Sequence, residues 1–111
     1  GKAINYLQYS LKIAQKNQDV KLEGYSIASL GNVYLAIGDN LKAFENLQQS
    51  LKIAQDIQDT ELQSKSLTSL GSLYINFKKY PEAIEYLQRS LIIARQIKER
   101  TVEAKTLDYI G

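Results

Sequence analysis

The feature that most constrains this chain is an internal repeat. The segment 7–15 recurs at 47–55 and again at 87–95, with the same small and large residues in the same order. Three glycines that each follow an apolar residue share the same spacing of about 40 residues: Gly31, Gly71 and Gly111. A fixed period of this length indicates that similar structural units stack one after another into a solenoid or array.

Within each unit the apolar residues follow a helical period. Ile27, Leu30 and Tyr34 lie three and four residues apart, as do Ala43, Leu47, Leu51 and Ala54 in the segment that follows. Each unit therefore consists of two amphipathic helices. We predict helices at about 2–16, 20–37, 40–56, 60–77, 80–97 and 100–110. The predicted fold is all-α, with about six antiparallel helices.

The residues between these segments suit helix ends. Gly38 can adopt the positive φ that closes a helix, and the side chains of Asp19 and Asp59 can cap the helices that follow them. Pro81 suits the first turn of a helix, where its missing N–H is not needed. These features support helix boundaries near all four residues.

Composition excludes several classes of function. The 111 residues suffice for one domain, and the absence of cysteine and histidine removes disulfides, Cys/His zinc sites and nucleophile–base pairs built on those residues. Carboxylates such as Glu82 and Glu85 lie on expected solvent-facing helix surfaces, so we expect neither an enzyme nor a cofactor.

No apolar run approaches the roughly 18 residues of a membrane span. We expect a cytoplasmic protein that does not enter membranes.

The charge pattern does not favour nucleic acid as a partner. The formal net charge is +2, and Lys42, Glu45, Lys52 and Asp56 alternate in sign along one predicted helix face. A nucleic-acid binder should concentrate its Lys and Arg side chains on one stripe. We therefore expect no nucleic-acid ligand.

The repeated residues resemble the tetratricopeptide repeat signature. The first copy has the residues Leu30, Gly31, Tyr34, Gly38, Ala43, Leu47, Leu51 and Ala54. The second copy has Leu70, Gly71, Tyr74, Pro81, Ala83, Leu87, Leu91 and Ala94, with Lys78 in place of the turn glycine. Because the usual repeat has about 34 residues, this chain is similar to the extended variety found in kinesin light chains and polarity adaptor proteins. The resemblance implies a right-handed α-α superhelix over residues 1–111.

In this register the chain begins and ends within repeats. Residues 1–19 correspond to the second helix of one repeat, 20–59 and 60–99 to two complete repeats, and 100–111 to the first helix of another. We expect the chain to be part of a longer array, because solenoids normally carry polar capping repeats. Apolar residues such as Leu7 and Leu107 should then leave uncovered surface at the two ends.

The resemblance also implies a binding groove, because the first helix of each repeat lines the concave side in this family and extended peptides bind there. The corresponding residues are Tyr25, Ala28, Asn32, Leu35, Lys65, Thr68, Ser72, Asn76, Lys105 and Asp108. Asn32 matches the groove asparagine of the carboxylate-clamp subfamily. Ala28, Thr68 and Ser69 stand where that clamp requires charge, so we do not expect a clamp. Tyr34 is better explained by packing, as are Tyr74 and Tyr86.

Two functions remain open at this point. The leading hypothesis is a protein-interaction scaffold that binds an extended peptide or partner protein in the groove. The alternative is a structural spacer or self-assembly element that associates through open repeat ends, by homo-oligomer formation or helix exchange. RNA binding has little support, since Lys65 and Lys105 form no continuous basic track.

Overall fold

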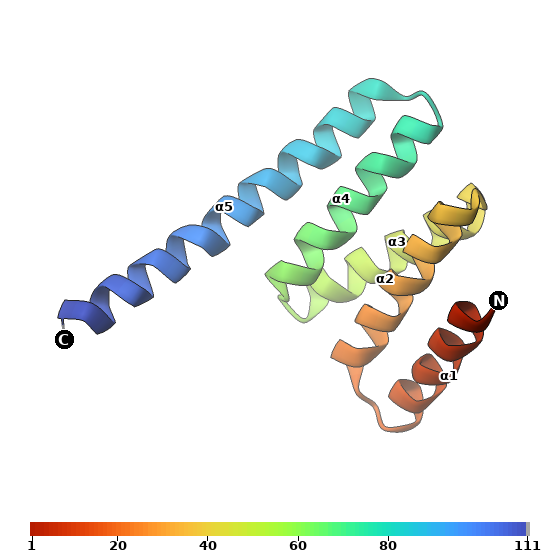
Figure 1. Ribbon diagram of the computed structural model, residues 1–111, viewed down its shortest axis with the longest axis horizontal. Coiled ribbons are helices and arrows are strands. Elements are labelled where there is room, and N and C mark those ends of the chain that lie inside the picture. Colours follow the sequence, from red (N-terminus) through yellow and green to blue (C-terminus); the bar gives the residue numbers. More distant parts are fainter. Residues whose placement is uncertain (111) are drawn as a thin grey trace.

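The structure, a computed structural model, describes the backbone of residues 1–110 and the side chains of residues 1–98 and 100. The described chain is all-helical: α1 (Lys2–Lys16), α2 (Val20–Ile37), α3 (Asn40–Asp56), α4 (Thr60–Asn76) and α5 (Tyr80–Ile110). Successive helices are joined by tight turns and reverse direction at each turn (Figure 1). The all-α prediction is confirmed, and the predicted bounds of the first four helices agree with the structure to within one residue.

The turns from α1 to α2 and from α3 to α4 are built alike. Gln18 and Gln58 adopt positive φ angles of 55° and 56°. The next residues, Asp19 and Asp59, each accept a hydrogen bond over 3.0 Å from the backbone N–H three residues further on. The left-handed residue ends one helix, and the carboxylate satisfies a donor at the start of the next. Both predicted caps are confirmed.

The turns within the two complete repeats differ from each other. Gly38 has φ 85°, and Asp39 Oδ1 accepts a hydrogen bond from the backbone N–H of Lys42 over 3.3 Å. In the second repeat Lys78 takes the left-handed position itself, with φ 60°. A side chain at such a position costs about 1–2 kcal/mol. Pro81 then lies in the first turn of α5, as predicted.

A helix boundary predicted near residues 98–99 is wrong. The single helix α5 replaces the two helices predicted at 80–97 and 100–110. Where the earlier turns have a left-handed glutamine and a capping aspartate, the chain here has Lys98 and Glu99. Both residue types favour helix interiors, and glutamate is not among the preferred N-cap residues, so the helix continues. The last part of α5 therefore projects beyond the bundle (Figure 1).

The core lies between the paired helices and depends on two close approaches. A Cβ atom added to Gly31 would lie 2.7 Å from Leu47 Cγ, and one added to Gly71 would lie 2.7 Å from Leu87 Cγ. Leu47 itself is fully buried. The leucine side chains thus occupy the space that any larger residue at these glycines would need, which confirms the predicted role of both positions.

Tyrosines fill the space around this core, as predicted. Tyr34 and Tyr86 are half-buried against the central cluster of leucines. The ring of Tyr74 stacks on Tyr86 with 5.1 Å between centroids and meets Phe44 edge-on at 6.3 Å. These rings join α4 to both of its neighbours in the chain, α3 and α5.

The second repeat packs on the first through α4, which contacts mainly α3 and, to a smaller extent, α2. The backbones of α2 and α4 approach each other, whereas within the described residues α1 and α3, and likewise α3 and α5, do not. A side-chain link joins α3 to α5, where Gln48 Nε2 donates to the Tyr86 hydroxyl over 3.2 Å. The two first helices consequently present their outward side chains next to each other.

Candidate functional site

The predicted binding stripe lies mainly on α2 and α4. Five of its residues lie exposed or half-buried on these two helices, and we call them the α2–α4 face: Tyr25, Asn32, Lys65, Ser72 and Asn76. Because α2 and α4 are neighbours, these side chains from sequence positions about 40 residues apart come together on one surface.

A hydrogen bond fixes Asn32 in the middle of this face. Ser69 Oγ, on α4, donates to Asn32 Oδ1, on α2, over 2.6 Å. Asn32 remains exposed, and because its oxygen serves Ser69, its amide nitrogen presents two donors outward. The bond therefore joins the two repeats and orients a polar group toward solvent.

A second link between the repeats joins Tyr25 to the start of α4. The Tyr25 hydroxyl donates to Asp59 Oδ1 over 3.4 Å. Asp59 Oδ2 also lies 4.0 Å from Lys21 Nζ, so this one carboxylate holds two side chains of α2 while capping α4. Burial raises the pKa of the Tyr25 hydroxyl above its ordinary value of 10.0, and the nearby charges of Asp59 and Glu61 raise it further.

Lys65 completes this end of the face. Its Nζ lies 5.8 Å from the centre of the Tyr25 ring and 3.4 Å from Glu61 Oε1. Both charged side chains are well exposed, so the ion pair is worth well under about 1 kcal/mol and yields readily to another partner. Lys65 is thus positioned but not tightly held.

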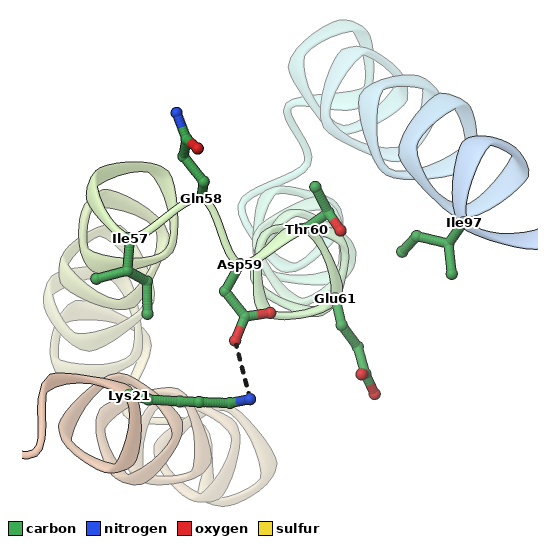
Figure 2. Close-up of a pocket in the computed structure, with 7 residues that line it drawn as sticks. All are labelled: Lys21, Ile57, Gln58, Asp59, Thr60, Glu61 and Ile97. Atoms are coloured by element: carbon green, nitrogen blue, oxygen red, sulfur yellow. Dashed lines mark ion pairs between the residues drawn. The ribbon is translucent and has the colours of Figure 1, made fainter. Parts of the chain in front are cut away.

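A hollow of about 610 Å³ opens beside these residues. Its lining comes from the start of α2, the α3–α4 turn and α5: Lys21, Ile57, Gln58, Asp59, Thr60, Glu61 and Ile97. Figure 2 shows Lys21 extending toward Asp59 from below the turn. With two carboxylates, one ammonium group and aliphatic carbon in its wall, the hollow suits a polar or basic side chain.

Two predicted contact residues are packing residues instead. Ala28 is only 7% exposed and lies in a buried cluster with Ala54 and Leu62. Leu35 is half-buried against the central core. Ala28 is covered because α4 packs across it, and this depends on the closeness of the two first helices. A ligand on the surface cannot reach Ala28.

Thr68 is exposed but serves a different interface. Its Oγ1 donates to the Ser64 carbonyl over 3.0 Å and lies 2.6 Å from Ser90 Oγ on α5. Thr68 therefore faces α5, away from Asn32. Lys105 and Asp108, also predicted for the groove, lie outside the residues whose side chains the structure describes.

Sequence reasoning missed three residues that organise the face: Asp59, Glu61 and Ser69. Asp59 was recognised only as a cap, and Ser69 only as a position that lacks charge.

Within the described residues no three His, Cys, Asp or Glu side chains gather as a metal site would require. No helix in that part of the chain has the length and apolarity to cross a bilayer.

Antiparallel helix pairs, repeated at a constant interval and stacked so that α4 packs on the preceding pair, define a helical-repeat protein of the α-solenoid class. A family model described as tetratricopeptide repeat matches residues 22–96, and the chain belongs to that family. The family is a non-catalytic scaffold family whose repeats generally bind protein partners. A comparison with curated proteins gave no match, so the assignment rests on the repeat itself.

Proposed function

We propose that this chain is a scaffold that binds an extended segment of a partner protein along the α2–α4 face. The single observation that carries the proposal is the exposed Asn32 side chain, which Ser69 holds by its oxygen over 2.6 Å. A side-chain amide with its nitrogen outward and its rotamer fixed is suited to pair with a peptide carbonyl group at little cost in conformational entropy.

The surroundings of Asn32 support a peptide as the ligand. Lys65 lies toward one end of the α2–α4 face, where its weak ion pair with Glu61 could be exchanged for a carboxylate of the ligand. Asn76 is exposed on the same helix and adds a further amide. The face thus offers several hydrogen-bonding groups along two parallel helices, which matches the repeating polar groups of an extended backbone.

The same proposal extends to the kind of scaffold, its location in the cell and the class of its ligand. The repeat interval of about 40 residues supports an adaptor of the extended kind found in kinesin light chains. The absence of cysteine supports a cytoplasmic location. The mixed charges on α3, where Lys52 pairs with Asp56 over 3.4 Å, support a protein ligand over a nucleic acid.

The test is selection of random peptides displayed on phage against the wild-type chain, followed by measurement of each selected peptide on two variants. The double variant Asn32→Ala/Lys65→Glu alters the α2–α4 face. The matched control, Gln49→Ala/Lys52→Glu, changes the same kinds of side chain at exposed positions on α3. We expect the selected peptides to bind the control as they bind wild type and to lose at least tenfold in affinity for the face variant, about 1.4 kcal/mol. Equal binding to both variants, with helicity unchanged, would refute the proposal.

Self-association remains a second candidate function, because Leu91 and Ile92 are exposed where the next repeat would stack. A spacer of this kind would form oligomers in sedimentation experiments. The Asn32→Ala/Lys65→Glu substitutions would leave that association unchanged. Leu7, predicted to be uncovered at the other end, is half-buried instead, since α1 packs on α2.

A further inference from the structure

In the described structure one carboxylate oxygen in the hollow beside the α3–α4 turn lacks a hydrogen bond. Asp59 Oδ1 accepts two, from the backbone N–H of Leu62 over 3.0 Å and from the Tyr25 hydroxyl over 3.4 Å. Asp59 Oδ2 instead lies 4.0 Å from Lys21 Nζ, which is too long for a hydrogen bond. The Asp59 side chain is mostly buried, with 13% exposed, and it lines the hollow. A donor that enters the hollow would therefore stabilise this oxygen.

Glu61 places a second carboxylate at the same hollow. Its side chain is 66% exposed, and its Oε1 lies 3.4 Å from Lys65 Nζ. Lys65 and Lys21, the cations of the two ion pairs, are both well exposed, so both pairs are weak and can be exchanged for other partners. The lining itself carries two carboxylates against one ammonium group, which favours a cationic ligand group.

Aliphatic carbon forms much of the remaining wall. In Figure 2 Ile57 and Ile97 lie on opposite sides of the Asp59 and Glu61 carboxylates. The volume of about 610 Å³ leaves room for one long side chain. These walls suit an apolar stem that ends in a planar cation with several N–H donors, which describes arginine. The ammonium group of lysine is more strongly hydrated and offers no such fork, so it suits the hollow less well.

We propose that the hollow binds an arginine side chain of the partner segment that lies along the α2–α4 face, with the guanidinium group between Asp59 Oδ2 and Glu61. This assignment rests on the proposed function, because the segment must run from Asn32 toward the start of α4. A ligand carboxylate that takes Lys65 releases Glu61 for the arginine. The ligand thus exchanges one ion pair within the protein for two across the interface.

The spacing along α4 sets the position of this arginine in the ligand. Glu61 and Ser69, the partner of Asn32, stand eight positions apart on α4. That separation is about 12 Å of helix at about 1.5 Å per residue. An extended chain covers the same length in about three to four residues. The arginine should therefore follow or precede, by that interval, the residue whose carbonyl group pairs with Asn32.

The peptides selected on phage against the wild-type chain serve as probes. Asn32→Ala alone reports on the proposed function, since Asn32 lies apart from the hollow and Lys65 does not. Among the peptides that lose affinity for Asn32→Ala, we expect an arginine at a constant position. Replacing that arginine with glutamine should lower the affinity for wild type about tenfold, as for the loss of a hydrogen-bonded charge.

Double-mutant cycles show whether the arginine acts through the hollow. Glu61→Gln and Asp59→Asn, of which the latter can still cap α4, should each weaken the arginine peptides by about three- to tenfold. Both should leave the glutamine versions nearly unchanged. The matched control Glu85→Gln, at an exposed position on α5, should affect neither set. A new selection against Glu61→Lys should replace the arginine with an acidic residue.

The outcomes separate this assignment from the proposed function. Peptides that require Asn32 but carry no constant arginine would overturn the assignment and leave the proposed function standing. So would an arginine whose contribution is unchanged in Glu61→Gln and Asp59→Asn. Peptides that bind Asn32→Ala as they bind wild type, or a selection that yields no peptide, would overturn both.

Discussion

The hydroxyl oxygens of Ser50 and Ser66 lie 2.8 Å apart in the interface between α3 and α4, where both side chains are buried. Ser50 Oγ also donates to the Leu47 carbonyl over 2.9 Å. A hydroxyl has one proton, so Ser66 is the donor in the serine pair and Ser50 the acceptor. The two residues are therefore not equivalent, although their side chains are identical.

Replacing Ser50 should cost more stability than replacing Ser66. Ser50→Ala leaves the Ser66 hydroxyl without its acceptor in a buried interface, which costs about 1–3 kcal/mol. Ser66→Ala leaves Ser50 bonded to Leu47 and should cost less. Urea unfolding followed by circular dichroism measures both, and the double variant should lose less than the sum of the two. Equal losses would show that the donor assignment is wrong.

Alanine at Gly31 should destabilise the fold despite its higher helix propensity. The added Cβ would lie 2.7 Å from Leu47 Cγ and 3.3 Å from the Leu47 backbone nitrogen, so the helices would have to separate. We expect a loss of about 1–3 kcal/mol in the free energy of unfolding. The comparison is Gly38→Ala, which meets no neighbour but is strained by φ 85°, and which Gly38→Asn should partly relieve. A stabilised Gly31→Ala variant would contradict the close approach.

Removing the Asp59 carboxylate should cost more than removing that of Asp39. Both cap a helix, and loss of a cap costs about 0.5–2 kcal/mol. Asp59 also accepts from Tyr25, whereas the described contact of Asp39 is the cap itself. We expect Asp59→Ala to lie near the upper end of that range and Asp59→Asn, which can still cap, near zero. Thermal unfolding of Asp59→Ala, Asp59→Asn and Asp39→Ala measures the difference, and a loss in Asp59→Asn as large as that in Asp59→Ala would assign the effect to the charge of Asp59.

The raised pKa of Tyr25 predicts loss of stability at alkaline pH. Below pH 10 the tyrosine is protonated in both the folded and the unfolded chain. Above its ordinary pKa of 10.0 the unfolded chain releases the proton while folded Tyr25 retains it, because burial, and then the Asp59 charge, disfavour the phenolate. The folded state then binds more protons, so the free energy of unfolding falls as pH rises above 10.0.

Unfolding curves recorded from neutral to alkaline pH test this. Tyr25→Phe should show a shallower fall than wild type, with part of the fall remaining because burial also raises the pKa of Tyr74. Asp59→Asn should bring the pKa of Tyr25 closer to 10.0, which the ultraviolet absorbance of the phenolate reports. An alkaline limb that Tyr25→Phe leaves unchanged would exclude Tyr25 as a source.

The helices and their turns were predictable because local chemistry determines them. Gly38 and Asp59 act within a few residues of their own positions, and the apolar period repeats in each copy. The turn near Lys98 was predicted from the repeat interval alone. That argument transferred the earlier boundary to a place where Lys98 and Glu99 had replaced the residues that form it.

The site was less predictable because it depends on how two helices pack. A sequence pattern assigned Ala28 and Asn32 to one stripe, but only the distance between α2 and α4 decides that Ala28 is covered and Asn32 is not. The bond from Tyr25 to Asp59 spans 34 positions in sequence and has no local signal. The repeat period supplies one usable clue, since it relates Tyr25 to Lys65 directly.

The second complete repeat meets the first through α4, which packs mainly on α3 and to a smaller extent on α2, while Gln48 and Tyr86 join α3 to α5 by a side-chain bond. A small rotation of one repeat on the next therefore changes side-chain contacts around α4, while every helix keeps its internal hydrogen bonds. The curvature of such an array can change without the unfolding of any helix.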